Sequence, residues 1–487
     1  MKYLPQSPHV SIIIPSYNGL EILRECLGSL NAVTYPIRKL ETIVVDDGSC
    51  DGTVEELRRH YRTVKVVKNP RRLGFVKSIQ KGVTLSRGAV LVFLNIDTRV
   101  DTGWLRALID CLSPAEGIVC SCSHILSWDG ARVELAGREF DAFDLNQANA
   151  AVSPTRITRK NGPTLFASGG SMAILKRAYS TIGGFDEDYE IYHEDVDLGW
   201  RLWTRGYKVW YSKESIVHHR GGSTTRTWGA SPQLAEMRLY LIRNTMYTII
   251  KNFQSRTLSR MLSPTISYMR DNALSQMQFH TMTEAIIEVE LNLRKLLIKR
   301  RRVQAKRVKS DSEIFAETGH PLQFLLNSRY MLEGAFETLR FDETDLETKI
   351  RHLLFNTLAE KLAATKDFLL VNDPLGSYMA LSRDPISALL FVYYSRSDLQ
   401  HAFPEVRSGD YSNLIRWAAR FGAKEAQVLA KHKPWYDSHV AKANVKTLRA
   451  ELESVVGFVS DKLHRFYEGT SSKSSVTTAS GKERTDS

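Results

Sequence analysis

Acidic side chains follow several apolar runs of this chain at positions where they could bind a ligand or a metal. Asp46 and Asp47 end one run, and residues 95–97 (Asn-Ile-Asp) end another. A carboxylate at the end of a strand can accept hydrogen bonds from a base or a ribose, and it can hold a divalent cation together with phosphate oxygens. The same acids are common in turns and helix caps, so their positions leave both roles open.

Residues 193–201 (HEDVDLGWR) place three acids in the first turns of a predicted helix. A carboxylate here could act as a general base if it faces a cleft and reaches the hydroxyl that it deprotonates. Acids at a helix N-terminus also interact favourably with the helix dipole, and Asp197 can pair with Arg201 one turn later. The spacing does not choose between the catalytic and the structural role.

Two adjacent histidines, His218 and His219, end a predicted strand in residues 217–224 (VHHRGGST). Histidine is a common metal ligand and titrates near neutral pH. Successive side chains of a strand point to opposite faces, so at most one of the two histidines faces a given site.

Four apolar, β-branched runs indicate the elements that position these side chains. Each run ends in polar residues, as expected for strands buried on both faces, and helical patterns lie between them. This alternation favours a parallel sheet of right-handed βαβ units, whose ligands bind outside the carboxyl ends of the strands. The runs are residues 10–14, 42–47, 64–67 and 89–95.

The character of the sequence changes beyond residue 231. Few β-branched runs remain, and amphipathic windows such as TEAIIEVELNLRKLLIKRRR predict helices as far as residue 466. The end of the chain is polar and rich in Ser and Thr, and we expect it to be disordered. The predicted organisation is a domain at 1–230, a helical extension at 231–310, a helical domain at 311–466 and a tail at 467–487.

The composition is that of a globular protein: of 487 residues, 43% are hydrophobic and 25% are charged, which excludes a globally disordered chain. The net charge is +12, and nine Lys and Arg with no acid lie in residues 294–309, which we call the basic cluster. An anionic membrane, a phosphate-bearing partner and a solvated or internally paired helix face all fit the cluster. Nucleic acid is disfavoured as a partner, because no aromatic residues are interleaved for base stacking.

No stretch of the sequence is long and apolar enough to span a membrane, and the N-terminus lacks the pattern of a cleaved signal. The five cysteines, an odd number confined to residues 26–122, fit a reducing compartment. Neither a G-x-G-x-x-G after the first strand nor a P-loop is present, which disfavours dinucleotide enzymes and P-loop NTPases. We expect a cytoplasmic protein, and the basic cluster leaves peripheral attachment to the inner face of the cell membrane open.

Several segments, taken in order, resemble family 2 of the glycosyltransferases, in particular the rhamnosyltransferase-like branch of bacterial and archaeal surface-polysaccharide enzymes. The resemblance covers residues 8–228 and implies the α/β fold called GT-A, a Rossmann-like, mostly parallel sheet flanked by helices, here followed by an all-α C-terminal region. The segments are VSIIIPSYNG, TIVVDDGSCDGT, LVFLNIDTRVDTGWL, the stretch from FASGGSMAILK to HEDVDLGWRLWTRGYKVWY, and SIVHHRGGST.

The resemblance also implies a role for each candidate residue. Asp97 holds the last place of the family's metal-binding D-x-D motif, and His218 resembles the later histidine that joins the metal or the diphosphate. Asp195 matches the base of the E-D motif, with Glu194 beside it. The residues that would contact the nucleotide are Pro15, Ser16, Tyr17, Asp47 and Asn95.

The implied reaction is an inverting transfer from a sugar linked to UDP, dTDP or GDP to a hydroxyl of a glycan or a lipid-linked acceptor. A divalent metal, Mn²⁺ or Mg²⁺, would stabilise the departing diphosphate together with His218. Asp195 would take the proton of the attacking hydroxyl. The expected enzyme is a hexosyl- or rhamnosyl-type transferase of cell-envelope polysaccharide biosynthesis.

Two departures from the family pattern matter. Asn95 stands where the D-x-D motif has its first acid, so one negative metal ligand is missing. The Q-x-x-R-W signature of processive synthases is absent after the E-D motif, which favours the addition of one or a few sugars. Asn95 and the long helical region leave a second function open, that of a catalytically weakened scaffold that binds sugar nucleotides or glycans.

Overall fold

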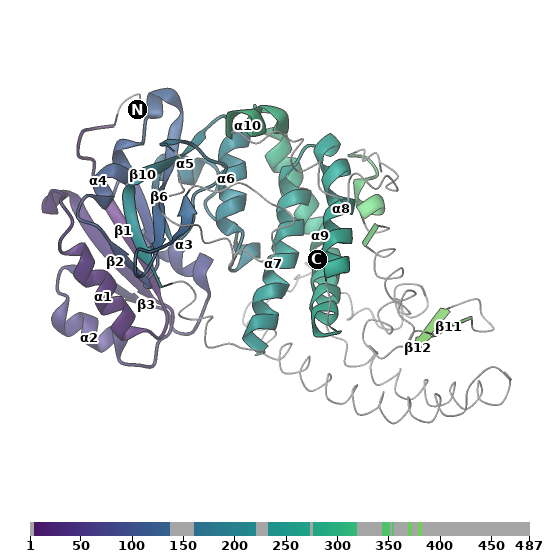
Figure 1. The fold of residues 1–487 in the computed structure, drawn as a ribbon, viewed down its shortest axis with the longest axis horizontal. Coiled ribbons are helices and arrows are strands. Elements are labelled where there is room, and N and C mark those ends of the chain that lie inside the picture. The colour runs from purple at the N-terminus through teal and green to yellow at the C-terminus, as the bar shows by residue number, and fades with distance from the viewer. Residues whose placement is uncertain are drawn as a thin grey trace, which may run out of the picture. The chain divides into compact units, whose positions relative to one another are not determined.

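The computed structural model describes residues 4–136, 160–220, 232–272, 276–318, 343–350, 353–354, 369–372 and 378–381. The chain divides into two units, residues 1–354 and 355–487, and each is described by itself. Figure 1 shows the first unit as a twisted sheet with covering helices, followed by a group of long helices. All candidate site residues belong to the first unit.

The first half of the sheet is the parallel arrangement that the sequence predicts. Its strands are β1 (Val10–Ser16), β2 (Leu40–Asp46), β3 (Val64–Lys68) and β4 (Val90–Leu94), with helices α1 (Leu20–Leu30), α2 (Thr53–His60) and α3 (Phe75–Leu85) between them. β1 pairs in parallel with β2 and β4, and β2 pairs with β3, so that Ser16 lies beside Asp46 and Asp46 beside Lys68. The carboxyl ends of these strands therefore meet at one edge of the sheet.

The second half of the sheet is mixed, with the full order β3-β2-β1-β4-β9-β6-β10-β5. β9 lies antiparallel between β4 and β6, and β10 runs parallel to β6. An antiparallel neighbour needs no helical crossover, and residues 160–170 lead into β9 without a helix. The α/β prediction is confirmed, with fewer parallel pairs than expected. The bounds are β5 (Thr98–Val100), β6 (Ile118–Ser127), β7 (Val133–Ala136, beside β6), β8 (Gly162–Pro163, beside β10), β9 (Ser171–Leu175) and β10 (Lys208–His219).

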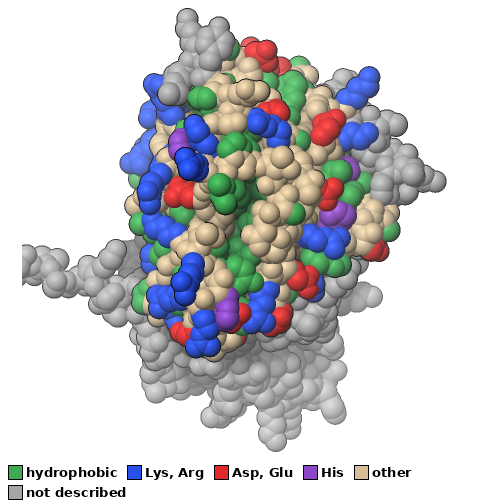
Figure 2. All heavy atoms as spheres, turned by 90° about the vertical axis from the view of Figure 1, so that its left-hand side faces the viewer, with side chains coloured by type: hydrophobic (Ala, Val, Ile, Leu, Met, Phe, Trp, Pro, Cys, Tyr) green, Lys and Arg blue, Asp and Glu red, His purple; other side chains and the backbone are tan. Residues whose placement is uncertain are grey.

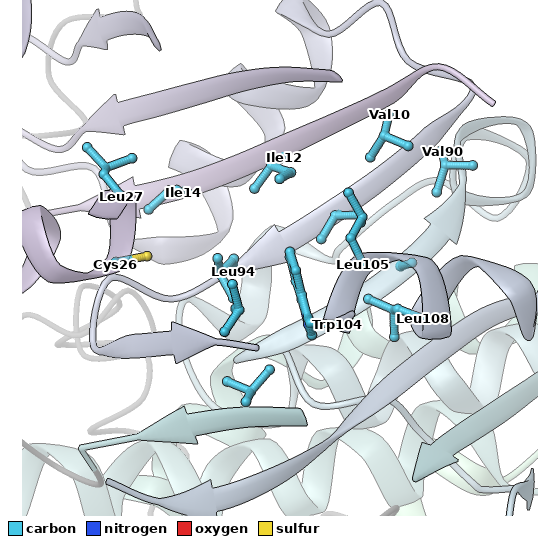
Figure 3. Close-up of a cluster of buried hydrophobic side chains, with 14 of the residues drawn as sticks. Val10, Ile12, Ile14, Cys26, Leu27, Val90, Leu94, Trp104, Leu105 and Leu108 are labelled. Carbon is cyan, nitrogen blue, oxygen red and sulfur yellow. The ribbon is translucent and has the colours of Figure 1, made fainter. Parts of the chain in front are cut away.

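A buried apolar cluster fills the space between the sheet and helices α1 and α4 (Trp104–Asp110) (Figure 3). Alternate residues of β1, such as Ile12 and Ile14, point into it, and each buried side chain of this size contributes about 1.5–3 kcal/mol. The indole N–H of Trp104 lies 3.1 Å from the hydroxyl of Ser123 and 3.0 Å from that of Ser171. The cluster thereby ties α4 to β6 and to β9, whose first residue adjoins the candidate site.

Helix α6 (Glu194–Thr204) lies between the sheet and the long helices that follow (Figure 1). Gly199 allows a close approach, because a Cβ there would lie 2.6 Å from the carbonyl oxygen of Leu165. Trp200 packs against Phe253 and Phe315, with ring centroids 4.7 and 5.4 Å apart. The remaining helices are α5 (Lys176–Thr181), α7 (Pro232–Asn252), α8 (Ser255–Asn272), α9 (Gln276–Ala305) and α10 (Asp311–Thr318), and 3-10 turns span Ile37–Lys39, Pro114–Glu116 and Glu187–Tyr189.

The helices predicted directly beyond residue 231 are confirmed by α7 to α10, but the prediction that the C-terminal region is all-α is wrong. In the second unit, β11 (Leu369–Asn372) and β12 (Tyr378–Leu381) form an antiparallel pair, which lies within the stretch predicted to be helical. The predicted domain boundaries stay predictions, and the predicted tail at 467–487 lies outside the described residues. Of the helices that the structure describes, none combines the length and the apolar character needed to cross a membrane.

Candidate functional site

The ends of β1 and β2 present two buried polar atoms without a hydrogen bond, the hydroxyl of Ser16 and Oδ2 of Asp46. The two residues are neighbours on adjacent strands. The other oxygen of Asp46, Oδ1, accepts from the backbone N–H groups of Gly48 and Ser49 at 3.2 and 3.0 Å. Buried polar atoms rarely stay unpaired in folded proteins, so this edge of the sheet is suited to a ligand that supplies the missing partners.

Asp47, which the resemblance assigns to the nucleotide, is engaged with its own loop. Its Oδ1 accepts from Asn69 Nδ2, Leu73 N and Ser78 Oγ at 2.8, 2.8 and 3.0 Å, and its Oδ2 accepts from Gly74 N at 2.9 Å. These bonds fix the turn that leads into α3. Asp47 thus shapes the rim of the site, and its contact with a nucleotide stays a prediction.

The turn held by Asp47 places Arg72 over the ring of Tyr17. The guanidinium carbon lies 4.6 Å from the ring centroid, within the range of a cation–π interaction. Tyr17 is 38% exposed, and Pro15 before it is half-buried at the end of β1. The pair forms a flat, positively charged rim next to Ser16.

At the neighbouring strand ends, Asp97 lies beside His219 of β10. Nε2 of His219 is 3.4 Å from Oδ2 of Asp97, and its Nδ1 is 2.7 Å from Oε2 of Glu134 on β7. Burial lowers the pKa of His219, but hydrogen bonds with Asp97 and Glu134 outweigh burial and raise this pKa to about 10. His219 is therefore a cation held between two carboxylates.

His218, the histidine that the resemblance selects, faces the other way. Its Nε2 lies 3.4 Å from Oδ1 of Asp101. The two histidines alternate along β10, and the pairing of β10 with β5 decides which of them faces Asp97. The structure brings His219, and not His218, to Asp97. The sequence showed the alternation but not this register.

A divalent cation fits this pair only as a two-donor site. In the described part of the chain, no three His, Cys, Asp or Glu side chains are grouped to hold a metal ion. Asp97 offers a carboxylate and His219 an imidazole once its proton is lost. A hard divalent cation takes its other ligands from phosphate oxygens and water, so the residues fit a metal that binds together with a diphosphate.

The turn Gly169-Gly170 joins the end of β4 to the E-D motif. The N–H of Gly169 donates to Oδ2 of Asp195 at 3.0 Å, and the carbonyl of Gly170 accepts from the N–H of Asn95 at 3.1 Å. A Cβ on Gly169 would lie 3.4 Å from Oε1 of Glu194, and a Cβ on Gly170 would lie 3.8 Å from Nδ2 of Asn95. Two small residues thus bring Asn95 and the motif acids to one turn.

The two acids of the E-D motif differ in their surroundings. Glu194 is 6% exposed, and its Oε2 is buried without a hydrogen bond. Burial and the charge of Asp195 raise the pKa of Glu194 well above its ordinary value, which favours its protonated form. Asp195 is half-buried and accepts from the N–H groups of Gly169 and Val196 at 3.0 and 2.8 Å. These two N–H donors stabilise a negative charge on Asp195.

Asn244 of α7 holds the backbone that leads into α6. Glu190, Tyr192 and His193 have positive φ angles of 59°, 63° and 65°, a conformation that costs about 1–2 kcal/mol per residue without glycine. The side-chain amide of Asn244 donates to three carbonyl oxygens of this segment. The acceptors, 2.7–2.9 Å away, belong to Tyr189, Ile191 and Tyr192. These bonds stabilise a strained entry to the E-D motif.

Lysines of α7 and α9 neutralise other acids of the same segment. Lys251, 1% exposed, lies 2.6 Å from carboxylate oxygens of both Asp186 and the buried Asp197. Lys299 pairs with Asp186 and Asp188. Burial raises the pKa of Asp186, but Lys251 and Lys299 outweigh it and hold this pKa below its ordinary value. These acids are fixed as structural anions.

Most of the basic cluster is paired with acids of the first unit. Six of its nine basic side chains pair with acids: Arg294, Lys295, Lys299, Arg300, Arg307 and Lys309. Arg300 is fully buried and also donates to the carbonyl oxygens of Ile250 and Phe253 at 2.7 and 2.5 Å. Other Lys and Arg side chains, outside the basic cluster, lie at the surface of the part of the first unit that carries the sheet (Figure 2). Internal pairing therefore accounts for most of the cluster.

Sequence reasoning missed Glu134, Gly169, Asn244 and Lys251. The charge complementarity between residues 186–190 (DEDYE) and the basic cluster was a visible signal for internal ion pairs. Asn244 and Glu134 carried no such signal, because each is a single polar residue far along the chain from its partner.

A mixed sheet whose strand ends carry these motifs, followed by an E-D helix, defines a GT-A glycosyltransferase domain. Residues 11–183 match the family model described as Glycosyl transferase family 2. The chain therefore contains a domain of glycosyltransferase family 2, as the sequence predicts.

Named relatives agree with this assignment. The chain is 36% identical over 109 residues to glycosyltransferase AglE of Haloferax volcanii, which is 22% of this chain and 36% of that protein. It is 26% identical over 242 residues to N-acetylglucosaminyl-diphospho-decaprenol L-rhamnosyltransferase of Mycobacterium tuberculosis, 44% of this chain and 77% of that protein. The match thus spans 36% of the length of the first relative and 77% of the second.

Solved structures with a similar fold include GalNAc-T7 with UDP, GalNAc and Mn²⁺, at 18% identity and a TM-score of 0.42 over 60% of this chain and 58% of that chain. Another is mannosyltransferase PcManGT of Pyrobaculum calidifontis in complex with GDP-Man and Mn²⁺, at 15% identity and a TM-score of 0.37 over 73% of this chain and 88% of that chain.

Proposed function

We propose that this chain is an inverting, non-processive glycosyltransferase that moves a sugar from a nucleotide-diphosphate sugar to a hydroxyl of a glycan or a lipid-linked acceptor. The observation that carries the proposal is the Gly169-Gly170 turn, which contacts Asp195 on one side and Asn95 on the other. The family 2 match and the relatives named as glycosyltransferases support it.

The donor's nucleotide would bind at the ends of β1 and β2. Oδ2 of Asp46 can accept an N–H or O–H bond, and the hydroxyl of Ser16 can donate one, which pairs both buried atoms. The exposed ring of Tyr17, with Arg72 over one face, would offer its other face to the base. Pro15, Asp47 and Asn95 complete the proposed nucleotide contacts.

Asp195 would accept the proton of the acceptor hydroxyl as its oxygen bonds to the anomeric carbon. The bond from that carbon to the diphosphate oxygen breaks on the opposite face, so the configuration inverts and no covalent glycosyl-enzyme forms. Protonated Glu194 supports this role, because it leaves a single negative charge at the motif.

Asp97 and His219 would hold a divalent metal, Mn²⁺ or Mg²⁺, when the diphosphate is present. Such a metal would stabilise the negative charge of the departing diphosphate. His219→Ala and His218→Ala form a matched pair for this assignment. We expect His219→Ala to weaken the Mn²⁺-dependent thermal shift given by a nucleoside diphosphate, and His218→Ala to leave it unchanged; the reverse result would contradict the assignment.

A panel of UDP-, dTDP- and GDP-sugars, incubated with the chain and Mn²⁺ or Mg²⁺, tests the activity itself. We expect one donor to release its nucleoside diphosphate, and Asp195→Asn to abolish the release. Donor binding in a thermal-shift assay without any release would favour the binding scaffold instead. No release and no binding across the panel would contradict both functions.

We also propose, more narrowly, that the exposed part of the basic cluster contacts an anionic membrane. Only Arg301, Arg302 and Lys306 of the basic cluster are exposed without an ion pair in the described residues. Each such charge adds about 1 kcal/mol near an anionic surface. Flotation with anionic vesicles, compared with the Arg302→Gln/Lys306→Gln variant, measures this contribution.

A further inference from the structure

A half-open cavity of about 830 Å³ lies in the helical part of the first unit. Its wall comes from the start of α8, from α9 and from the segments around α10, and none of the candidate site residues lines it. A volume of this size is within the range of ligand-binding cavities, roughly 300–1,000 Å³. The cavity is therefore separate from the proposed donor site and large enough for a small molecule.

Three arginines line the cavity, Arg256, Arg260 and Arg301. Arg256 and Arg260 are one turn apart on α8, where like charges repel each other. In the described part of the chain, none of the three forms an ion pair, whereas six neighbouring cations of the basic cluster do. The lining of the cavity thus holds more cations than acids.

The one acid in the wall, Glu343, interacts most closely with the buried Arg300 and more weakly with the charge of Arg301. It pairs with the buried Arg300, with Oε1 2.5 Å from Nη2, and it also accepts from the hydroxyl of Ser255 at 2.6 Å. Burial raises the pKa of Glu343, but the hydrogen bond with Arg300 is among the interactions that outweigh it and lower this pKa. The charge of Glu343 is therefore already matched within the protein.

We propose that this cavity binds a phosphate-bearing ligand through Arg256, Arg260 and Arg301. The planar guanidinium group presents paired N–H donors that match two phosphate oxygens, and three such groups can surround one diphosphate. Ser312, exposed in the same wall, adds a hydroxyl donor. The site stands apart from the proposed transfer reaction, since its residues contact neither Asp97 nor Asp195.

Inorganic pyrophosphate is the probe, titrated by calorimetry into the full chain in the presence of EDTA. The chelator removes metal-assisted binding beside Asp97. We expect the wild-type chain to bind pyrophosphate and the Arg260→Gln/Arg301→Gln variant to bind it about tenfold more weakly, because two charge-assisted contacts are lost. The matched control, Arg302→Gln/Lys306→Gln, removes the same charge from exposed positions outside the cavity and should change the affinity less than about twofold.

Absence of pyrophosphate binding to the wild-type chain would overturn the site, and so would an equal loss in the control variant. Vesicles of phosphatidylglycerol, compared with phosphatidylcholine, distinguish the source of the phosphate. Vesicle binding that is lost in Arg260→Gln/Arg301→Gln identifies a lipid headgroup, whereas vesicle binding that this variant retains, with pyrophosphate binding lost, identifies a soluble ligand. Transfer to a soluble acceptor should be unchanged in both variants, so the site and the proposed function can fail independently.

Discussion

Two groups of acids lie within residues 186–197, and their partners differ. Asp186, Asp188 and Asp197 each meet a cation of the helices that follow, and Asp197 is fully buried with Lys251. Glu194 and Asp195 instead lie against the Gly169-Gly170 turn. Cations fix the acids of the first group, whereas backbone N–H groups and a glycine turn surround the acids of the second. The sequence of residues 186–197 alone does not show this difference.

The largest effect should follow from Asp195→Asn, which tests the chemical side of this comparison. Loss of a general base lowers turnover by about 10²- to 10⁴-fold, and the amide keeps an oxygen for the N–H of Gly169. We expect the rate of nucleoside diphosphate release to fall by this factor while the free energy of unfolding changes little. Undiminished release would place the base elsewhere.

Lys251→Met tests the structural side. It removes one of the two cations that pair with Asp186 and with the buried Asp197, which keep Lys299 and Arg201 respectively, and removing one partner of a buried ion pair costs about 3–5 kcal/mol. Urea unfolding should show a loss of this size. Lys295→Met is the control, because Lys295 is 59% exposed and pairs with Asp188 at the surface; its loss should stay below about 1 kcal/mol. Equal losses would remove the distinction between the two groups.

Asn244→Ala tests whether a structural contact controls the position of the motif acids, because Asn244 holds the backbone that carries them. We expect kcat to fall about tenfold, since a small misplacement of a catalytic group is costly, while KM for the donor changes little. Asn292→Ala is the control, because among the described residues Asn292 donates to a carbonyl of its own helix. A rise in KM with kcat unchanged would assign Asn244 to donor binding instead.

The smallest effect concerns the protonation of Glu194. The raised pKa of Glu194 means that the folded chain keeps a proton that the unfolded chain releases above about pH 4.5. The stability contributed by this proton is complete below that pH and is lost as pH rises through the folded-state pKa. The Glu194→Gln side chain cannot ionise. Its free energy of unfolding, measured relative to that of the wild type, should therefore increase steadily from pH 5 to pH 8. Parallel curves would contradict a protonated Glu194.

The sequence predicted what local patterns determine. Apolar runs located β1 to β4 because a strand buried on both faces needs them, and the acids after those runs fell at the sheet edge as expected. His219 was not selected over His218, because the choice depends on the register of β10 against β5. Asn244 and Lys251 were not found, because their partners lie more than 50 residues earlier in the chain.

Side chains of α7 contact the segment that precedes α6. These contacts matter when domains of related proteins are exchanged to make chimeras. A fragment that ends near residue 230 would keep Asp186 and Asp197 and lose Lys251, Lys299 and Asn244. A chimera that exchanges the sheet alone between relatives would join acids to helices that did not evolve to neutralise them. The smallest exchangeable module of this chain is therefore the sheet together with α7 and α9.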